Sequence, residues 1–187
     1  MTFLIGAVRW RLGYEQPLEL SLPLKASDTR RLRWIHYWMM IGVALTSVGL
    51  AATALNARSL WAAVAGVLYA MGATAWLIAI TFRLTVEEWA AAETVTTGMV
   101  PSIYPPLAAW SGGLYGLHMT TAYISAIPLG IMIVIEDLGP IWLGWAGAVW
   151  GTACAIGFVV TRGAGPYSPP FLAHLFTGAV GLTLLLS

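Results

Sequence analysis

Polar side chains recur at helical spacing within one apolar stretch of the sequence. They are Ser111, Tyr115, His118, Thr121 and Ser125. Residues spaced three, four or seven apart share one face of a helix. In lipid, such groups point into a helical bundle, where they either bond neighbouring helices or line a cavity. The sequence leaves both interpretations open.

The chemistry of this polar face would centre on His118, because imidazole takes up and releases protons near neutral pH. His118, Tyr115 and Glu93 could supply acid and base to a membrane enzyme that acts on a lipid or isoprenoid. This hypothesis requires Glu93 to reach inward from a short surface helix. The cavity would then be lined by Ser111, Ser125, Trp76 and Trp150.

Three histidines raise a second possibility, which is haem b held by two imidazoles, or a quinone site, in an electron-transfer subunit. Two of them, His36 and His174, lie near the starts of predicted helices and therefore at a similar depth. His118 lies roughly 17 Å along its helix at about 1.5 Å per residue. His36 and His174 could then share a haem, and His118 could join only if the glycine-rich start of its helix is shifted or re-entrant. We predict no cofactor from the remaining residues, and no metal site apart from this haem pair.

The elements that must position these residues are strongly apolar. Of the 187 residues, 59% are hydrophobic and 9% charged, and the mean hydropathy is +0.79. That is too little charged surface for a soluble globule. Apolar runs of about 20 residues or more can cross a membrane as helices. Five such spans are predicted, over residues 35–55, 60–82, 107–135, 141–160 and 170–187.

The cations predict how the chain is oriented. Eight of the nine Lys and Arg residues precede the first span or fall in the second and fourth loops. The positive-inside rule therefore places the N-terminus in the cytoplasm and the C-terminus on the opposite side of the cell inner membrane. We expect a cytoplasmic or interfacial segment, residues 1–33, followed by a five-helix transmembrane domain, residues 34–187.

Two segments outside the spans have a predicted structure of their own. Thr85 and Glu88 have the spacing of a capping box, which predicts that a new helix begins here and lies on the cytoplasmic surface over about 86–97. Leucine alternates with other residues over Leu18–Lys25, which predicts an extended strand that lies along the interface or pairs with a partner or a second copy. The predicted fold is thus an all-α membrane bundle of five transmembrane helices with a short interfacial helix and an extended N-terminal segment.

Two resemblances add to this interpretation. The run PIWLGWAGAVWG from Pro140, with LAAWSGGLYG from Leu107, resembles small polytopic bacterial membrane proteins of unknown function, which implies a bacterial inner membrane. The five-helix topology resembles the cytochrome b anchor of some succinate:quinone reductases. That family places histidine pairs for two haems on several helices, and three histidines cannot supply such pairs.

Charge and small residues bear on the partners. A net charge of +1 without a concentrated basic stripe argues against nucleic acid. Small residues four apart, such as Gly112 with Gly116 and Gly147 with Gly151, predict close helix contacts within or between subunits. We expect membrane lipid and a protein partner or second copy. The leading interpretation is a non-enzymatic subunit or accessory partner of a membrane assembly, with the lipid enzyme and the electron carrier as alternatives.

Overall fold

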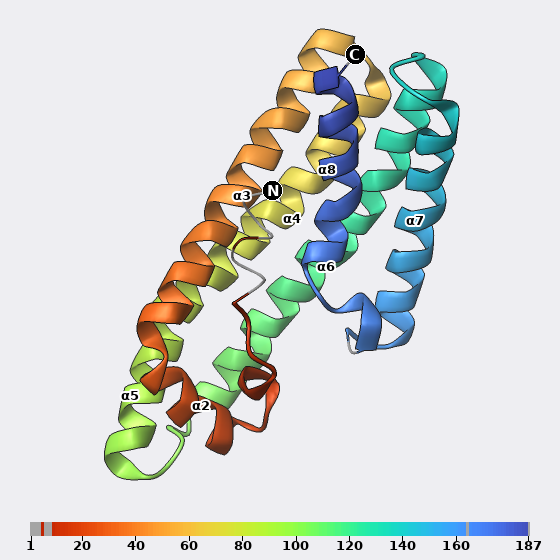
Figure 1. Cartoon of the computed structure of the whole chain (residues 1–187). Coiled ribbons are helices and arrows are strands. Elements are labelled where there is room, and N and C mark those ends of the chain that lie inside the picture. The colour runs from red at the N-terminus through yellow and green to blue at the C-terminus, as the bar shows by residue number, and fades with distance from the viewer. Residues whose placement is uncertain (1–4, 6–8, 164, 187) are drawn as a thin grey trace. The chain divides into compact units, whose positions relative to one another are not determined.

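The computed structural model describes residue 5, residues 9–163 and residues 165–186, and every regular element in these ranges is helical (Figure 1). The α-helices are α2 (Leu18–Ser27), α3 (Thr29–Ala57), α4 (Leu60–Phe82), α5 (Glu88–Thr97), α6 (Tyr104–Ile135), α7 (Ile141–Val160) and α8 (Phe171–Leu186). Two short 3-10 segments, η1 (Leu12–Glu15) and η3 (Gly165–Tyr167), and a π-helical segment, η2 (Arg83–Glu87), connect them. The all-α prediction is confirmed for the described residues.

Among the described residues, four helices are long and apolar enough to cross a membrane by length and composition. They are α3, the continuous helix Leu60–Thr97, α6 and α7. These coincide with the first four predicted spans. The fifth prediction, 170–187, corresponds to α8, which has 16 residues and is apolar but shorter. At about 1.5 Å per residue, α8 rises roughly 24 Å, against a hydrocarbon core of about 30 Å.

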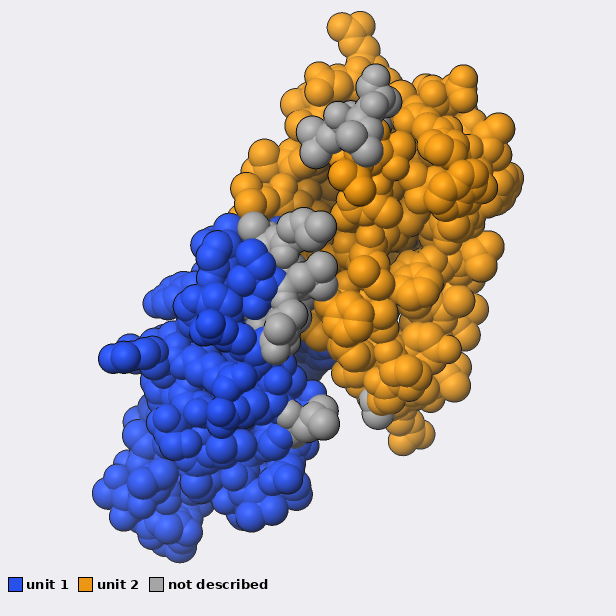
Figure 2. Space-filling view, in the orientation of Figure 1, with its two compact units in different colours: residues 1–42, 76–115 blue, residues 43–75, 116–187 orange. Residues whose placement is uncertain are grey.

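The chain forms two compact units, which Figure 2 draws in different colours. Unit 1 comprises residues 1–42 and 76–115, and unit 2 comprises residues 43–75 and 116–187. Helices α3, α4 and α6 each contribute one part to each unit. The predicted division into residues 1–33 and 34–187 concerns position in the membrane and stays a prediction.

The segment Leu18–Lys25 is not a strand, so that prediction is wrong: it lies within α2, with Pro23 inside the helix. The alternation of leucines is real, but Leu20 is 62% exposed. Leu18, Leu22 and Ala26, four residues apart, instead pack on the core of unit 1. A helix buries this face and satisfies its own backbone groups, whereas a lone strand would leave those groups unpaired.

The capping box at Thr85 does not form, so the prediction of a helix start there is also wrong. The Thr85 hydroxyl donates to the Thr81 carbonyl at 2.8 Å, within its own helix. Helix α4 continues through η2 into α5, and Glu87, before α5, has helical backbone angles and makes no side-chain cap. The unbroken helix pairs its own backbone groups, so no cap is needed. It ends at Gly98, whose φ of 75° is left-handed.

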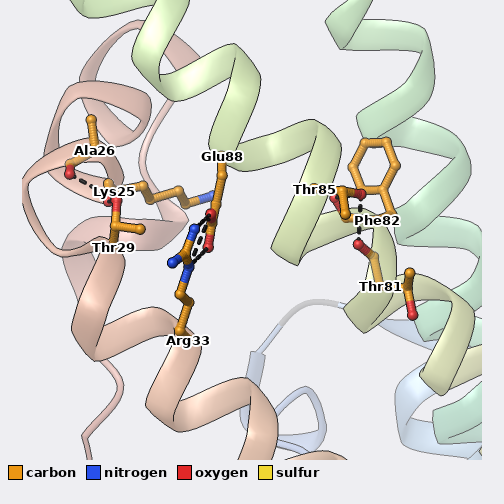
Figure 3. Close-up of polar contacts among 8 residues, drawn as sticks. All are labelled: Lys25, Ala26, Thr29, Arg33, Thr81, Phe82, Thr85 and Glu88. Carbon is orange, nitrogen blue, oxygen red and sulfur yellow. Dashed lines mark hydrogen bonds and ion pairs between the residues drawn. The ribbon is translucent and has the colours of Figure 1, made fainter.

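Ion pairs join the elements of unit 1. The Arg33 guanidinium of α3 binds the Glu88 carboxylate of α5 through two atoms, with Nη2 2.7 Å from Oε2 and Nε 2.9 Å from Oε1 (Figure 3). The preceding residue, Glu87, pairs with Lys25 of α2 at 3.2 Å and accepts a hydrogen bond from the Tyr104 hydroxyl of α6 at 3.2 Å. One turn of helix therefore binds α2, α3 and α6.

Glycines allow close packing in unit 2. Gly130 and Gly144 bring the backbones of α6 and α7 together. A Cβ at Gly147 of α7 would collide with the Phe176 ring of α8. A Cβ at Gly151 would lie 2.5 Å from the Tyr123 carbonyl oxygen of α6. Gly147 and Gly151 thus serve contacts within the chain, and α6, α7 and α8 pack side by side (Figure 1).

Candidate functional site

Three side chains from three helices meet in the interior of unit 2. Tyr69 of α4, His118 of α6 and His174 of α8 are 0%, 0% and 8% exposed, respectively. The two imidazole rings have centroids 5.8 Å apart and are tilted by 32°. The Tyr69 ring meets both edge-on, with its centroid 6.4 Å from that of His118 and 5.9 Å from that of His174. We call Tyr69, His118 and His174 the histidine cluster.

A polar contact lies within the cluster. The Tyr69 hydroxyl oxygen is 3.4 Å from Nδ1 of His174. When His174 carries its proton on Nε2, the hydroxyl donates to Nδ1, and in the other tautomer Nδ1 donates to the hydroxyl oxygen. His174 can therefore take a proton at one ring nitrogen and release one at the other.

Gly72 brings α4 close to α6 at the cluster. A Cβ at Gly72 would collide with the Thr121 hydroxyl and would lie 3.1 Å from the His118 carbonyl oxygen. Gly72 follows Tyr69 by three residues, so the two share a helix face. The bare backbone at position 72 thus lets the Tyr69 face of α4 reach His118.

The residues of the cluster can donate and accept protons. Within the described part of the chain, no group of three or more His, Cys, Asp or Glu side chains is arranged to hold a metal ion. Two imidazoles and a phenol, by contrast, are all groups that donate and accept protons. The arrangement can pass a proton between neighbouring side chains inside an apolar bundle.

The predicted haem pair, His36 and His174, is divided between the two units. His36 lies in the unit 1 part of α3, buried, with its ring centroid 6.4 Å from that of Trp10. A haem between His118 and His174 would occupy the plane midway between their rings. Tyr69 is nearly equidistant from both rings and so lies across that plane. A planar haem in that position would meet the Tyr69 ring.

The polar face of α6 is shared between the units. Ser111 and Tyr115 belong to unit 1, and His118 and Ser125 belong to unit 2. The Ser125 hydroxyl donates to the Ala122 carbonyl of its own helix at 2.7 Å. Ser111 is buried, and its hydroxyl bonds no group in the described ranges. The Ser125 bond thus lies within α6, and the cavity lining that the spacing of the serines suggests stays a prediction.

The other predicted catalytic residues lie in unit 1. Tyr115 packs on the buried Trp76, with ring centroids 5.0 Å apart, and the Arg83 guanidinium lies 5.2 Å from the centroid of the Trp76 ring and 5.9 Å from that of Tyr115. Glu93 is exposed on α5, as is Trp89, whereas Ala90 and Ala91 of the same helix are buried. The carboxylate thus does not face the core of unit 1.

Trp150, predicted to line a cavity, lies at a helix contact. Its side chain is 36% exposed, and Nε1 donates to the Leu172 carbonyl at 3.4 Å. The bond joins α7 to the first turn of α8. The predicted role of Trp150 in a cavity lining stays a prediction.

Two features of the cluster escaped sequence reasoning. The first is Tyr69, which is the one tyrosine of the predicted span 60–82, a span without charged residues. The second is the contact between His118 and His174. The distance of each histidine from the start of its own helix does not predict this contact, because the helices do not all begin at the same level in the bundle. A polar aromatic residue in the middle of a span was the available signal.

No family model, curated protein or solved structure matches this chain. The resemblance of Pro140–Gly151 to small bacterial membrane proteins stays a prediction.

Proposed function

We propose that this protein is a non-enzymatic subunit of a membrane assembly, in which the histidine cluster passes protons. The proposal is carried by the burial of two imidazoles, in ring contact, among apolar helices, of which α6 and the continuous helix Leu60–Thr97 are long enough to cross a membrane. Ionisable side chains in such surroundings are costly to keep and mark proton or ligand paths. Imidazole changes its charge closer to neutral pH than other side chains do.

The cluster offers a short relay. A proton that reaches one nitrogen of His174 releases the proton on the other, and the Tyr69 hydroxyl at 3.4 Å can receive or supply it. His118, whose ring centroid is 5.8 Å away, is the next group that can be charged. Two imidazolium ions this close would repel strongly in an apolar interior, so the pair carries one extra proton at a time.

The proposed topology has five spans in a bacterial inner membrane, with the N-terminus in the cytoplasm. Support comes from six cations that precede the apolar part of α3, namely Arg9, Arg11, Lys25, Arg30, Arg31 and Arg33. With five spans, Arg83 and Arg162 fall on the same side as these six. Helix α8 is short for a span, and a membrane accommodates a short helix by local thinning. Helix α5 would lie at the cytoplasmic surface.

Open helix faces support a protein partner or a second copy. A Cβ at Gly66, Gly112 or Gly116 would meet no atom within 4 Å. Only 22% of the apolar window of α3 is buried within the chain, against 67% for α6. Small residues on such faces let another helix approach closely.

The two alternatives receive less support. A lipid enzyme built on His118, Tyr115 and Glu93 needs a carboxylate that faces inward, and Glu93 is exposed. A haem between His118 and His174 would occupy the plane midway between their rings, and the Tyr69 ring lies across that plane.

The proposal is tested by purifying the full chain from its native membrane in mild detergent. Co-purifying proteins are identified by mass spectrometry, and a visible absorption spectrum is recorded. We expect a stoichiometric partner and no haem absorption. A Soret band that disappears in His174→Gln would contradict the proposal in favour of haem. A colourless protein that purifies alone would contradict the subunit role and favour the enzyme.

A further inference from the structure

A recess of about 340 Å³ opens on unit 1 at the junction of α2 and α3. It is lined by Arg9, Ser27, Asp28, Arg30, Arg31 and Trp34. Three of these six side chains are guanidinium cations, and one is a carboxylate. One carboxylate can balance at most one of the three arginines, so the recess carries a net positive charge.

Among the described residues, Asp28 forms no ion pair with the three arginines that line the recess. Three cations of the N-terminal region have carboxylate partners, in the pairs Arg11 with Asp28, Lys25 with Glu87 and Arg33 with Glu88. In the described ranges, Arg9, Arg30 and Arg31 form no ion pair. The three cations left over are the three that line the recess.

The carboxylate of the recess is already occupied. Asp28 Oδ2 accepts hydrogen bonds from Arg11 at 2.7 Å and from the Tyr14 hydroxyl at 2.6 Å. Burial, together with this bond to Asp28, raises the pKa of Tyr14 to about 12, so the phenol remains a donor at neutral pH. The charge of Asp28 is therefore directed toward Arg11 and Tyr14, and the recess stays positive.

Two of the three guanidinium groups are held in place. Arg31 Nε donates to the Arg9 carbonyl at 2.8 Å. The two terminal nitrogens of the Arg31 guanidinium take no part in this bond. The Arg9 guanidinium lies 4.1 Å from the centroid of the Trp34 ring, in a cation–π contact. A ligand would meet cations that are already positioned, which lowers the entropic cost of binding.

We infer that this recess binds a phosphate-bearing anion, either the headgroup of an anionic lipid or free phosphate. Arginine forks match the geometry of phosphate oxygens and bind them in pairs of hydrogen bonds. The recess adjoins Trp34 and the start of the apolar run of α3 at Ile35. In a membrane-spanning helix this is the level of the lipid headgroups. The inference does not depend on the histidine cluster.

The test compares charge-removing variants of the purified full chain in detergent. Binding of phosphatidic acid is measured by native mass spectrometry, with phosphatidylcholine as the zwitterionic reference, and inorganic phosphate is titrated by calorimetry. Arg30→Gln and Arg31→Gln remove a cation of the recess. Arg58→Gln removes an exposed cation from the loop between α3 and α4 and serves as the matched control.

Phosphatidic acid is expected to bind more tightly than phosphatidylcholine, and each recess variant to weaken it about tenfold, as the loss of a charged hydrogen bond predicts. Arg58→Gln should bind like the wild type. If inorganic phosphate binds alone with the same dependence on Arg30 and Arg31, the inference holds with free phosphate as the ligand.

Equal binding of phosphatidic acid and inorganic phosphate by wild type, Arg30→Gln and Arg31→Gln would overturn the inference, as would an equal loss in Arg58→Gln. If Arg31→Gln fails to fold, Arg9→Gln repeats the test, because Arg9 lies outside the regular helices.

Discussion

The imidazole of His118, in the middle of α6, lies 5.8 Å from that of His174, in the first turn of α8. The short helix α8 therefore begins beside the middle of the long helix α6 (Figure 1). The Tyr69 ring of α4 contacts both imidazoles edge-on. Because one polar cluster joins three helices, its members should contribute to stability as well as to proton transfer.

Removing the Tyr69 hydroxyl should weaken the cluster modestly. Tyr69→Phe keeps the ring and deletes the 3.4 Å contact with His174 Nδ1 together with a side-chain hydrogen bond with Thr46, so we expect a loss of about 0.6 to 1.7 kcal/mol for each bond, the range of interhelical hydrogen bonds in membranes. Thermal unfolding in detergent measures it. Tyr37→Phe, on the exposed side of α3, is the matched control and should unfold like the wild type. Equal stability of all three proteins would refute the bond.

Two glycines of α4 should respond to alanine with opposite signs. In a helix interior, Gly→Ala ordinarily stabilises by roughly 0.5 to 1 kcal/mol. We expect that gain at Gly66 in the chain purified without a partner, because a Cβ there meets open space within the chain. At Gly72, a Cβ would meet Thr121 and the His118 backbone, so the crowding should cost about 1 to 3 kcal/mol. Denaturant unfolding measures the change in unfolding free energy of each variant. A stabilised Gly72→Ala would show that α4 and α6 do not approach as described.

Two adjacent glutamates should differ in their contribution to stability. Glu87 and its partner Lys25 have side chains 12% and 11% exposed, so Glu87→Gln leaves a largely buried ammonium ion uncompensated and should cost about 3 kcal/mol. The Glu88 partner, Arg33, is 56% exposed, and Glu88→Gln should cost about 1 kcal/mol or less.

Unfolding midpoints of the two variants measure this difference, with Glu93→Gln, at an exposed site of α5, as the control. A larger loss for Glu88→Gln than for Glu87→Gln would contradict the assignment of the buried pair.

The Tyr14 bond to Asp28 should make stability depend on pH in the alkaline range. Burial and this bond raise the pKa of Tyr14 from 10.0 to about 12, so the folded state holds the phenolic proton more tightly than the unfolded state. The stabilisation is complete below about pH 10 and is lost as the pH rises through 12. The difference in unfolding free energy between wild type and Tyr14→Phe should shrink accordingly. A difference that stays constant over this range would contradict the raised pKa.

The sequence predicted the long helices well because their signal is composition over many residues. Predicted spans 60–82 and 141–160 coincide with α4 and α7. The two errors were in short segments, Leu18–Lys25 and Thr85–Glu88. There, local patterns of leucine spacing and capping compete with tertiary packing, and the packing of Leu22 and the continuity of α4 with α5 prevailed.

The candidate site was predicted only in part. His118 is central, as its place on a polar helical face indicated. Its partners were not predicted, because Tyr69 and His174 come from helices whose relative height no sequence period encodes. Gly72 determines how closely α4 approaches α6, and its role depends on a neighbour distant in sequence.

Proton flux tests the central proposal most directly. The protein, together with whatever partners co-purify with it, is reconstituted into vesicles that enclose a pH-sensitive dye, and a pH gradient is applied. We predict that His118→Gln and His174→Gln each abolish the flux, whereas His36→Gln, which replaces a buried histidine of unit 1, retains it. Size-exclusion profiles confirm that the variants are folded. Undiminished flux in folded His118→Gln and His174→Gln would contradict the account.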